Sequence, residues 1–205
     1  MVTKEMLKNA LTQLGVEKGM VLEVHSSLSS FGELEGGAET VINTLKEIVT
    51  EEGSIFMPAL RLSRELPLTE EDKKLGITVK IKVLPPDSDR TAMGLVADTF
   101  RKLPDTYTGQ DVISTSGWGR HGKEVLEGGL DYPIRNGGKA LMLGVDIYKL
   151  TVSASMISER ENSVILWLVS IPEAKFPKEW WSMNFREETG RYLTASVRSR
   201  RHCRV

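Results

Sequence analysis

A serine-rich segment holds the densest set of groups in this sequence that could bind a ligand. Four serines lie between His25 and Gly32 in the run HSSLSSFG, after an apolar stretch and before an amphipathic repeat. Hydroxyls and free backbone N–H groups at such a strand-to-helix junction can hold phosphate oxygens, and a helix N-terminus favours negative charge. The same composition is typical of a turn that satisfies its own hydrogen bonds. The residue types alone leave both interpretations open.

A second segment imitates a nucleotide-binding loop without completing it. The run Gly117–Glu124 resembles G-x-x-x-x-G-K-[ST], but Glu124 stands where magnesium needs a hydroxyl ligand. Its carboxylate would also repel phosphate, and we expect no buried strand over Ser114–Ser116 in front of the loop. A serine hydrolase elbow, G-x-S-x-G, fails because Ser114 takes the place of the first glycine. These observations argue against both an NTPase and a serine hydrolase.

The metal-binding and redox residues are few and scattered. His25, His121 and His202 are far apart, and the single cysteine is Cys203, so the sequence predicts no metal site and no internal disulfide. One cysteine fits a reducing compartment, and the longest apolar run, Val164–Ile171, is too short to span a bilayer. No apolar signal core follows the first residues. We therefore expect a cytoplasmic protein.

The apolar periodicity predicts the elements that position these groups. A helix is expected between Thr3 and Gly15, and a strand–helix–strand unit follows it. Two strands joined by a helix normally lie parallel with a right-handed crossover, which favours a layered α/β sheet. The other expected elements are strands at 20–25, 54–58, 138–145 and 164–171, and helices at 91–102, 123–126 and 152–157. The helix inside the strand–helix–strand unit follows Gly37, carries apolar residues from Val41 to Val49, and is stopped by Gly53.

Two regions depart from this pattern. Residues 68–89 contain a charged run at 70–74 and an alternating, exposed strand pattern at 78–83, so we expect an excursion over one face of the domain. From Arg186 the chain has six Arg and no Lys in twenty residues. We expect a single α/β domain over 1–185 and an Arg-rich irregular tail over 186–205. The tail could be a basic binding segment, a frayed terminus or, as we favour, sequence translated out of the ancestral frame.

Five runs, taken in order, carry a resemblance to a known family. They are VHSSLSSFG with the EGGAETVI that follows, GSIFMP, RTAMGLVADTFR, STSGWG and GGKALMLGV. Together they resemble the aminoglycoside N(3)-acetyltransferase family from about residue 3 to residue 151. The resemblance implies an α/β class, with a layered α/β/α antibiotic-acetyltransferase-like fold and a mixed, largely parallel sheet. It also implies transfer of the acetyl group of acetyl-CoA to the 3-amino group of a 2-deoxystreptamine aminoglycoside.

The resemblance also implies which residues bind the coenzyme and the acceptor. The serine-rich turn would hold the pantetheine and pyrophosphate of CoA, and residues entering the helix at 91 would be second candidates. The partners would be CoA and a small-molecule aminoglycoside, and a net charge of -1 gives no field that selects nucleic acid or a membrane. The coenzyme-binding candidates are Ser26, Ser27, Leu28, Ser29, Phe31, Arg90 and Thr91. Because aminoglycosides are polycations, the acceptor surface should be acidic, with candidates Glu65, Glu70, Glu71 and Asp72.

The sequence departs from the family where a base is expected. The resemblance implies the motif H-P-x-H-S before the turn that contains Trp118, but residues 110–114 of this chain include no histidine. It also implies the motif T-x-x-H after the strand expected at 138–145, but Ala154 occupies the place of that histidine. An ammonium cannot attack a thioester, and histidine is the usual base near neutral pH. Asp146 and Glu159 are the catalytic candidates left, although both could be solvated carboxylates. The alternative is a catalytically inactive CoA-binding remnant or binding module.

Overall fold

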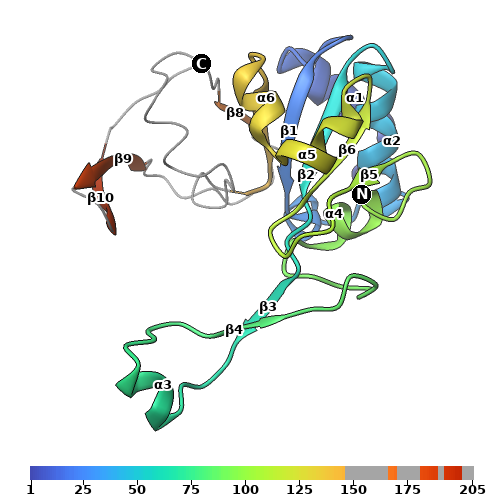
Figure 1. Cartoon of the computed structure of the whole chain (residues 1–205). Coiled ribbons are helices and arrows are strands. Elements are labelled where there is room, and N and C mark those ends of the chain that lie inside the picture. The colour runs from blue at the N-terminus through green and yellow to red at the C-terminus, as the bar shows by residue number, and fades with distance from the viewer. Residues whose placement is uncertain (146–165, 170–180, 189–191, 200–205) are drawn as a thin grey trace.

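A mixed six-stranded sheet forms the centre of the molecule. The computed structural model describes residues 1–145, 166–169, 181–188 and 192–199. The strand order is β5-β6-β2-β1-β7-β8 (Figure 1). β2, β1, β7 and β8 are mutually parallel, whereas β6 runs antiparallel to β2 and β5 antiparallel to β6. This confirms the predicted fold class. The strands are β1 (Val21–Ser26), β2 (Ser54–Pro58), β5 (Tyr107–Thr108), β6 (Thr115–Gly119), β7 (Lys139–Leu143) and β8 (Leu166–Val169).

Helices cover both faces of the sheet. α1 (Lys4–Gln13), α2 (Gly37–Val49) and α4 (Leu95–Phe100) share the main apolar core with one face of β1, β2 and β7. α5 (Val125–Gly128) and α6 (Asp131–Arg135) lie over the other face (Figure 1). Side chains alternate along a strand, so Leu22 and Val24 enter the main core while Glu23 and His25 face the α5–α6 layer. Both faces of β1 are therefore buried, as expected for a central parallel strand.

The first helix is capped by Thr3 and joined to α2 by two ion pairs. The Thr3 hydroxyl accepts a hydrogen bond from the N–H of Met6 at 3.2 Å and satisfies one of the free donors of the first turn. On the exposed side, Lys4 and Lys8 both bind the carboxylate of Glu47 on α2. These two ammonium groups lower the pKa of Glu47 to about 2. The clamp adds to the packing of α1 on α2.

The helix predicted from 91 begins later in the structure. Gly94 has φ 92°, outside the helical region, so α4 starts at Leu95. Thr91 lies in the preceding loop, where its N–H and its hydroxyl both donate to the buried carboxylate of Asp98 at 2.9 Å. Arg101 pairs with the same carboxylate at 3.0 Å. The charge pattern of this stretch therefore forms a local network around Asp98.

The expectation that Ser114–Ser116 is not a buried strand is wrong. These residues are buried, and β6 begins at Thr115 beside β2. Burial is possible because the hydroxyls are paired: Ser114 donates to the carbonyl of Ala59 at 2.9 Å, and Ser116 bonds Thr108 at 2.9 Å. The strand runs into η2 (Gly122–Glu124), whose backbone lies so close to β6 that no side chain would fit at position 117. Residues 117–124 therefore form the tightly packed end of β6 and the turn that follows it. Glu124, in place of the hydroxyl residue, still argues against a nucleotide-binding loop.

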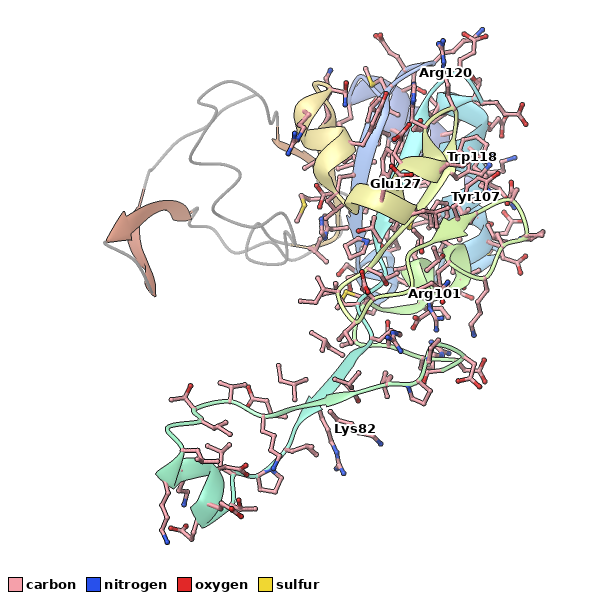
Figure 2. The ribbon with its side chains drawn as sticks, viewed as in Figure 1. Lys82, Arg101, Tyr107, Trp118, Arg120 and Glu127 are labelled. Atoms are coloured by element: carbon pink, nitrogen blue, oxygen red, sulfur yellow. The ribbon has the colours of Figure 1, made fainter. Side chains whose placement is uncertain are left out.

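The excursion predicted for 68–89 is an arm that projects from the body, rather than a layer over one face (Figure 1). β3 (Leu62–Glu65) and β4 (Ile81–Val83) form a two-stranded antiparallel ribbon, with α3 (Glu70–Lys74) near its far end. Of the strand pattern expected over 78–83, only 81–83 is paired. Figure 2 shows Lys82 on the arm, well away from Trp118 in the sheet. The main core contains no residue of the arm among those described.

The irregular tail predicted over 186–205 is corrected where the chain is described. β9 (Trp181–Glu188) and β10 (Tyr192–Ser199) pair as an antiparallel hairpin. Its alternation was hidden because Arg, Ser and Thr occupy many of its positions. The strand expected at 164–171 is present as β8. The helix expected at 152–157 falls outside the described residues. None of the helices in the described ranges is long and apolar enough to cross a bilayer.

Candidate functional site

A cleft of about 650 Å³ opens at the carboxyl ends of the parallel strands. In open α/β sheets, ligands bind in the crevice outside these strand ends. β1 supplies its last residues, Pro58 ends β2, and Val145 follows β7. The remaining wall comes from the loop before α4 and the first turns of that helix. The residues lining the cleft are Val24, His25, Ser26, Ser27, Leu28, Ser29, Gly32, Pro58, Ala92, Met93, Gly94, Leu95, Ala97 and Val145.

The serine-rich turn is held in place by the end of β7. After β1 the chain forms a single turn, η1 (Leu28–Phe31). The N–H of Ser27 donates to the carbonyl of Leu143 at 2.9 Å, and the Ser30 hydroxyl donates to the carbonyl of Gly144 at 2.7 Å. These two bonds fix the turn against the sheet. The turn is therefore a preformed part of the cleft wall.

The turn keeps donors that the described part of the chain does not use. The hydroxyls of Ser27 and Ser29 lie 3.1 Å apart, and within the described residues they bond only each other. Among the described residues no acceptor pairs with the N–H of Leu28 or Ser29, the first two residues of η1. A cluster of hydroxyls and N–H groups of this kind suits an anionic oxygen. Another part of the lining is apolar, because it is built from Pro58 and residues 92–95.

The structure brings together four of the predicted coenzyme-binding residues, Ser26, Ser27, Leu28 and Ser29. Phe31 is placed elsewhere: its side chain is only 4% exposed and belongs to the main core. Phe31 is the last residue of this single turn and its side chain belongs to the core, so its sequence position next to the serines misled the prediction. Phe31 is not among the residues that line the cleft. The structure therefore corrects its expected place from the cleft wall to the core.

Arg90 and Thr91 are also placed outside the cleft. Arg90 lines a separate hollow of about 430 Å³ together with Asp89 and Lys102. Thr91 is committed to the carboxylate of Asp98. Both predictions assumed that the helix starts at residue 91; with the later start, residues 92–95 line the cleft instead. The two catalytic candidates, Asp146 and Glu159, lie outside the described residues and remain predictions.

A buried pair that the sequence interpretation missed adjoins the cleft, because one of its two members, His25, is a lining residue. Nε2 of His25 lies 2.7 Å from Oε1 of Glu23, and the two residues are 6% and 3% exposed. The signal was present in the sequence as two polar residues at i and i+2 in a strand, which places them on the same face. Met93 and Gly94 were missed as well, because the helix was expected to begin before them.

The acidic candidates for an acceptor surface lie on the arm or at its base. The pKa of the Asp72 carboxyl is lowered to about 2. The main cause is its hydrogen bond with the Lys80 ammonium, and bonds with the backbone N–H and the hydroxyl of Thr69 add to the effect. Glu70 pairs with Lys73 at 2.7 Å. Two of the four proposed carboxylates therefore already have cationic partners. The acidic acceptor surface remains a hypothesis. Lys73 and Lys80 partly neutralise the negative charge that it would offer to a polycation.

Sequence comparison identifies relatives over the part of the chain that forms this cleft. The sequence profile of the family described as "Aminoglycoside 3-N-acetyltransferase" matches residues 24–153. The SPbeta prophage-derived aminoglycoside N(3')-acetyltransferase-like protein YokD of Bacillus subtilis (strain 168) is 35% identical over 133 residues, which is 60% of this chain and 49% of that protein. Aminoglycoside N(3)-acetyltransferase III of a Salmonella species is 46% identical over 56 residues, 27% of this chain and 20% of that protein. The chain thus aligns with about half the length of the first relative, and with less of the second.

Solved structures show the same fold. The crystal structure of YokD from Bacillus subtilis matches with a TM-score of 0.61 and 24% identity, covering 98% of this chain and 82% of that one. A binary complex of AAC-IIIb with CoASH matches with a TM-score of 0.60 and 20% identity, covering 97% of this chain and 74% of that one. The profile match covers the central strands, the serine-rich turn and α4, which are the elements that build the cleft. This chain therefore belongs to the aminoglycoside 3-N-acetyltransferase family.

Proposed function

We propose that this protein is an acyltransferase that binds acetyl-CoA in the cleft and transfers its acetyl group to the 3-amino group of a 2-deoxystreptamine aminoglycoside. The observation that carries the proposal is the cleft itself, where unused donors of the serine-rich turn face an apolar wall at the carboxyl ends of parallel strands. A relative with this fold, AAC-IIIb, was solved with CoASH. Others were solved with a gentamicin, with apramycin and with sisomicin.

The two walls of the cleft suit the two chemical halves of the coenzyme. The hydroxyls of Ser27 and Ser29 and the N–H groups of the turn can donate to diphosphate oxygens without giving up a bond to the rest of the protein. The apolar wall, with Pro58 and Met93, can pack against the pantetheine chain. A preformed turn loses little conformational entropy when the ligand binds. The cleft can therefore orient the thioester relative to β1.

The acceptor must lose a proton before it reacts. An aminoglycoside amine is largely protonated near neutral pH, and only the neutral amine can attack the thioester carbon. Asp146 and Glu159 are the carboxylates that we propose for the acceptor side, where they would also attract a polycation. Acetylation removes one positive charge from the antibiotic, so the activity would contribute to resistance. We expect it to operate in the cytoplasm, where a protein with one cysteine stays reduced.

A second function is favoured by one observation. Ala154 occupies the place where the family resemblance implies a histidine. A protein that binds CoA but transfers no acetyl group would fit that substitution, since general-base assistance is worth about a hundred- to ten-thousand-fold in rate. CoA binding and acetyl transfer must therefore be measured separately.

Acetyl transfer and coenzyme binding, measured side by side, test the proposal. We expect thiol release from acetyl-CoA that depends on a 2-deoxystreptamine aminoglycoside, with one acetyl group found on the antibiotic by mass spectrometry for each thiol released. Gentamicin, apramycin and sisomicin form the panel, and an amine without the 2-deoxystreptamine ring is the control. Coenzyme binding without transfer to any of them would establish the binding module instead. Absence of both would refute the proposed function.

A further inference from the structure

The buried pair on β1 is unusual for the centre of a parallel sheet. Glu23 has Phe56 and Ala140 as its register neighbours on β2 and β7, and His25 has Met142, so the pair sits in apolar surroundings. A buried ionisable group is costly unless it is paired. Replacing such a pair by apolar side chains of similar size is often neutral or stabilising. Stability alone therefore gives little reason for a carboxylate and an imidazole at these positions.

The geometry suits one tautomer of the imidazole. Nε2 lies 2.7 Å from Oε1 of Glu23, a contact that a hydrogen on Nε2 would fill, and the neutral ring with its hydrogen there has a lone pair on Nδ1. Within the part of the chain that the structure describes, Nδ1 has no hydrogen-bond partner. His25 also belongs to the residues that line the cleft, directly before Ser26. An imidazole paired with a carboxylate, in a residue that lines a ligand cleft, is the arrangement of a general base and its orienting partner.

We propose that His25, oriented by Glu23, is the base that deprotonates the acceptor amine, and this proposal rests on the acetyl transfer proposed above. Nδ1 takes a proton from the ammonium of the acceptor. The neutral nitrogen then forms a bond to the acetyl carbon, and the C–S bond breaks. CoA leaves as a thiolate and takes the remaining extra proton from nitrogen, which gives the amide and CoASH. The proton on His25 passes to solvent and restores the neutral ring.

This role explains how the chain can work without a histidine at position 154. The base would come from the carboxyl end of β1 instead of the region after β7. Glu23 is a positioning residue in this scheme, because it hydrogen-bonds the ring of His25 and does not itself line the cleft. It selects the tautomer and stabilises the imidazolium that forms during the reaction. The pair would thus carry out, within one strand, the work of a base and its orienting partner.

Two isosteric variants test the assignment against a matched control. His25→Gln should lower kcat about a hundred- to ten-thousand-fold while leaving KM for acetyl-CoA within about threefold, since the base acts on the amine and not on the coenzyme. Glu23→Gln should lower kcat by about ten- to a hundred-fold, the range seen when the partner of a functional imidazole at a metal site is removed. His121→Gln is the control, because that ring stacks on Tyr132 away from the cleft. It should keep the kcat of the unaltered protein.

The outcomes separate this proposal from the proposed function. An unaltered protein that transfers acetyl, together with a His25→Gln variant of undiminished kcat, overturns the base and leaves the transferase standing. A protein that binds CoA but transfers nothing overturns both the transferase and the base. Equal losses in kcat and in CoA binding for His25→Gln would show a structural role and overturn the proposal.

A spectroscopic measurement covers the case in which the variants fold poorly. Long-range ¹H–¹⁵N correlation of the unaltered protein reports the tautomer of each histidine directly. We expect the neutral His25 ring to carry its hydrogen on Nε2, with the Nδ1 resonance shifted when acetyl-CoA is added. A hydrogen on Nδ1 would remove the lone pair that the proposal needs and would overturn it.

Discussion

Replacing Ser27 by Trp should abolish the thermal stabilisation that acetyl-CoA gives to this protein. Ser27 lines the cleft, and its hydroxyl bonds that of Ser29 at the surface of the turn. The larger side chain therefore fills the space where the ligand would lie without removing a contact to the core. A ligand at a hundredfold excess over its Kd stabilises the folded state by about 2.7 kcal/mol. For a domain of this size that is a rise of roughly 5–10 °C in Tm. The variant should show no rise.

Differential scanning fluorimetry with and without acetyl-CoA measures this effect. Gln13→Trp is the matched control, because Gln13 is exposed at the end of α1 and lies outside the cleft. It should keep the full rise in Tm. If Ser27→Trp kept the rise while folding normally, the coenzyme would have to bind at another surface.

Gly144→Ala should weaken CoA binding and destabilise the fold together. Gly144 has φ 67°, which favours glycine, and its carbonyl accepts the hydroxyl of Ser30 at 2.7 Å. A methyl group at position 144 would overlap the Ser30 side chain, so the serine-rich turn must shift away from β7. A left-handed conformation costs a non-glycine residue about 1–2 kcal/mol. The overlap should add about 1–3 kcal/mol, the usual cost of overpacking.

Gly137→Ala separates these two contributions. Gly137 has φ 69°, nearly the same as Gly144, but nothing lies within 4 Å of the position that its methyl group would take. We expect this control to lose only the conformational part of the stability and to bind acetyl-CoA as tightly as the unaltered protein. Chemical denaturation and isothermal titration calorimetry give the two quantities. Equal losses for both variants would show that the Ser30–Gly144 contact does not position the turn.

The sequence predicts best those parts of the fold whose signal is local. The strands at 20–25 and 54–58 and the helix between them were predicted because apolar spacing and glycine punctuation agree there. The start of α4 was misplaced because the φ of Gly94 depends on the loop that it closes. β6 was missed because buried Ser114 and Ser116 are satisfied by partners on other segments, which periodicity cannot show. The projection of the arm from the body could not be predicted from the sequence, because a charged run does not indicate the direction in which a segment points.

The same distinction holds for the candidate site. Ser26 to Ser29 line one cleft as the sequence suggested, because a polar cluster after an apolar strand is a local pattern. Arg90 and Thr91 lie outside it because their expected place depended on where a helix begins, and Phe31 because its side chain enters the core. The pairing of Glu23 with His25 follows from strand alternation. Its burial between β2 and β7, and hence its chemical interest, follows only from the sheet order.

Hydrogen–deuterium exchange with and without acetyl-CoA tests most directly the claim that the cleft at the carboxyl ends of β1, β2 and β7 holds the coenzyme. The account predicts that saturating acetyl-CoA slows exchange in peptides covering 24–32, 92–95 and 144–145, the segments that line the cleft or fix its serine-rich turn. Peptides of the arm, 62–83, should exchange at the same rate in both conditions. Unchanged exchange in the cleft segments, or protection confined to the arm, would contradict it.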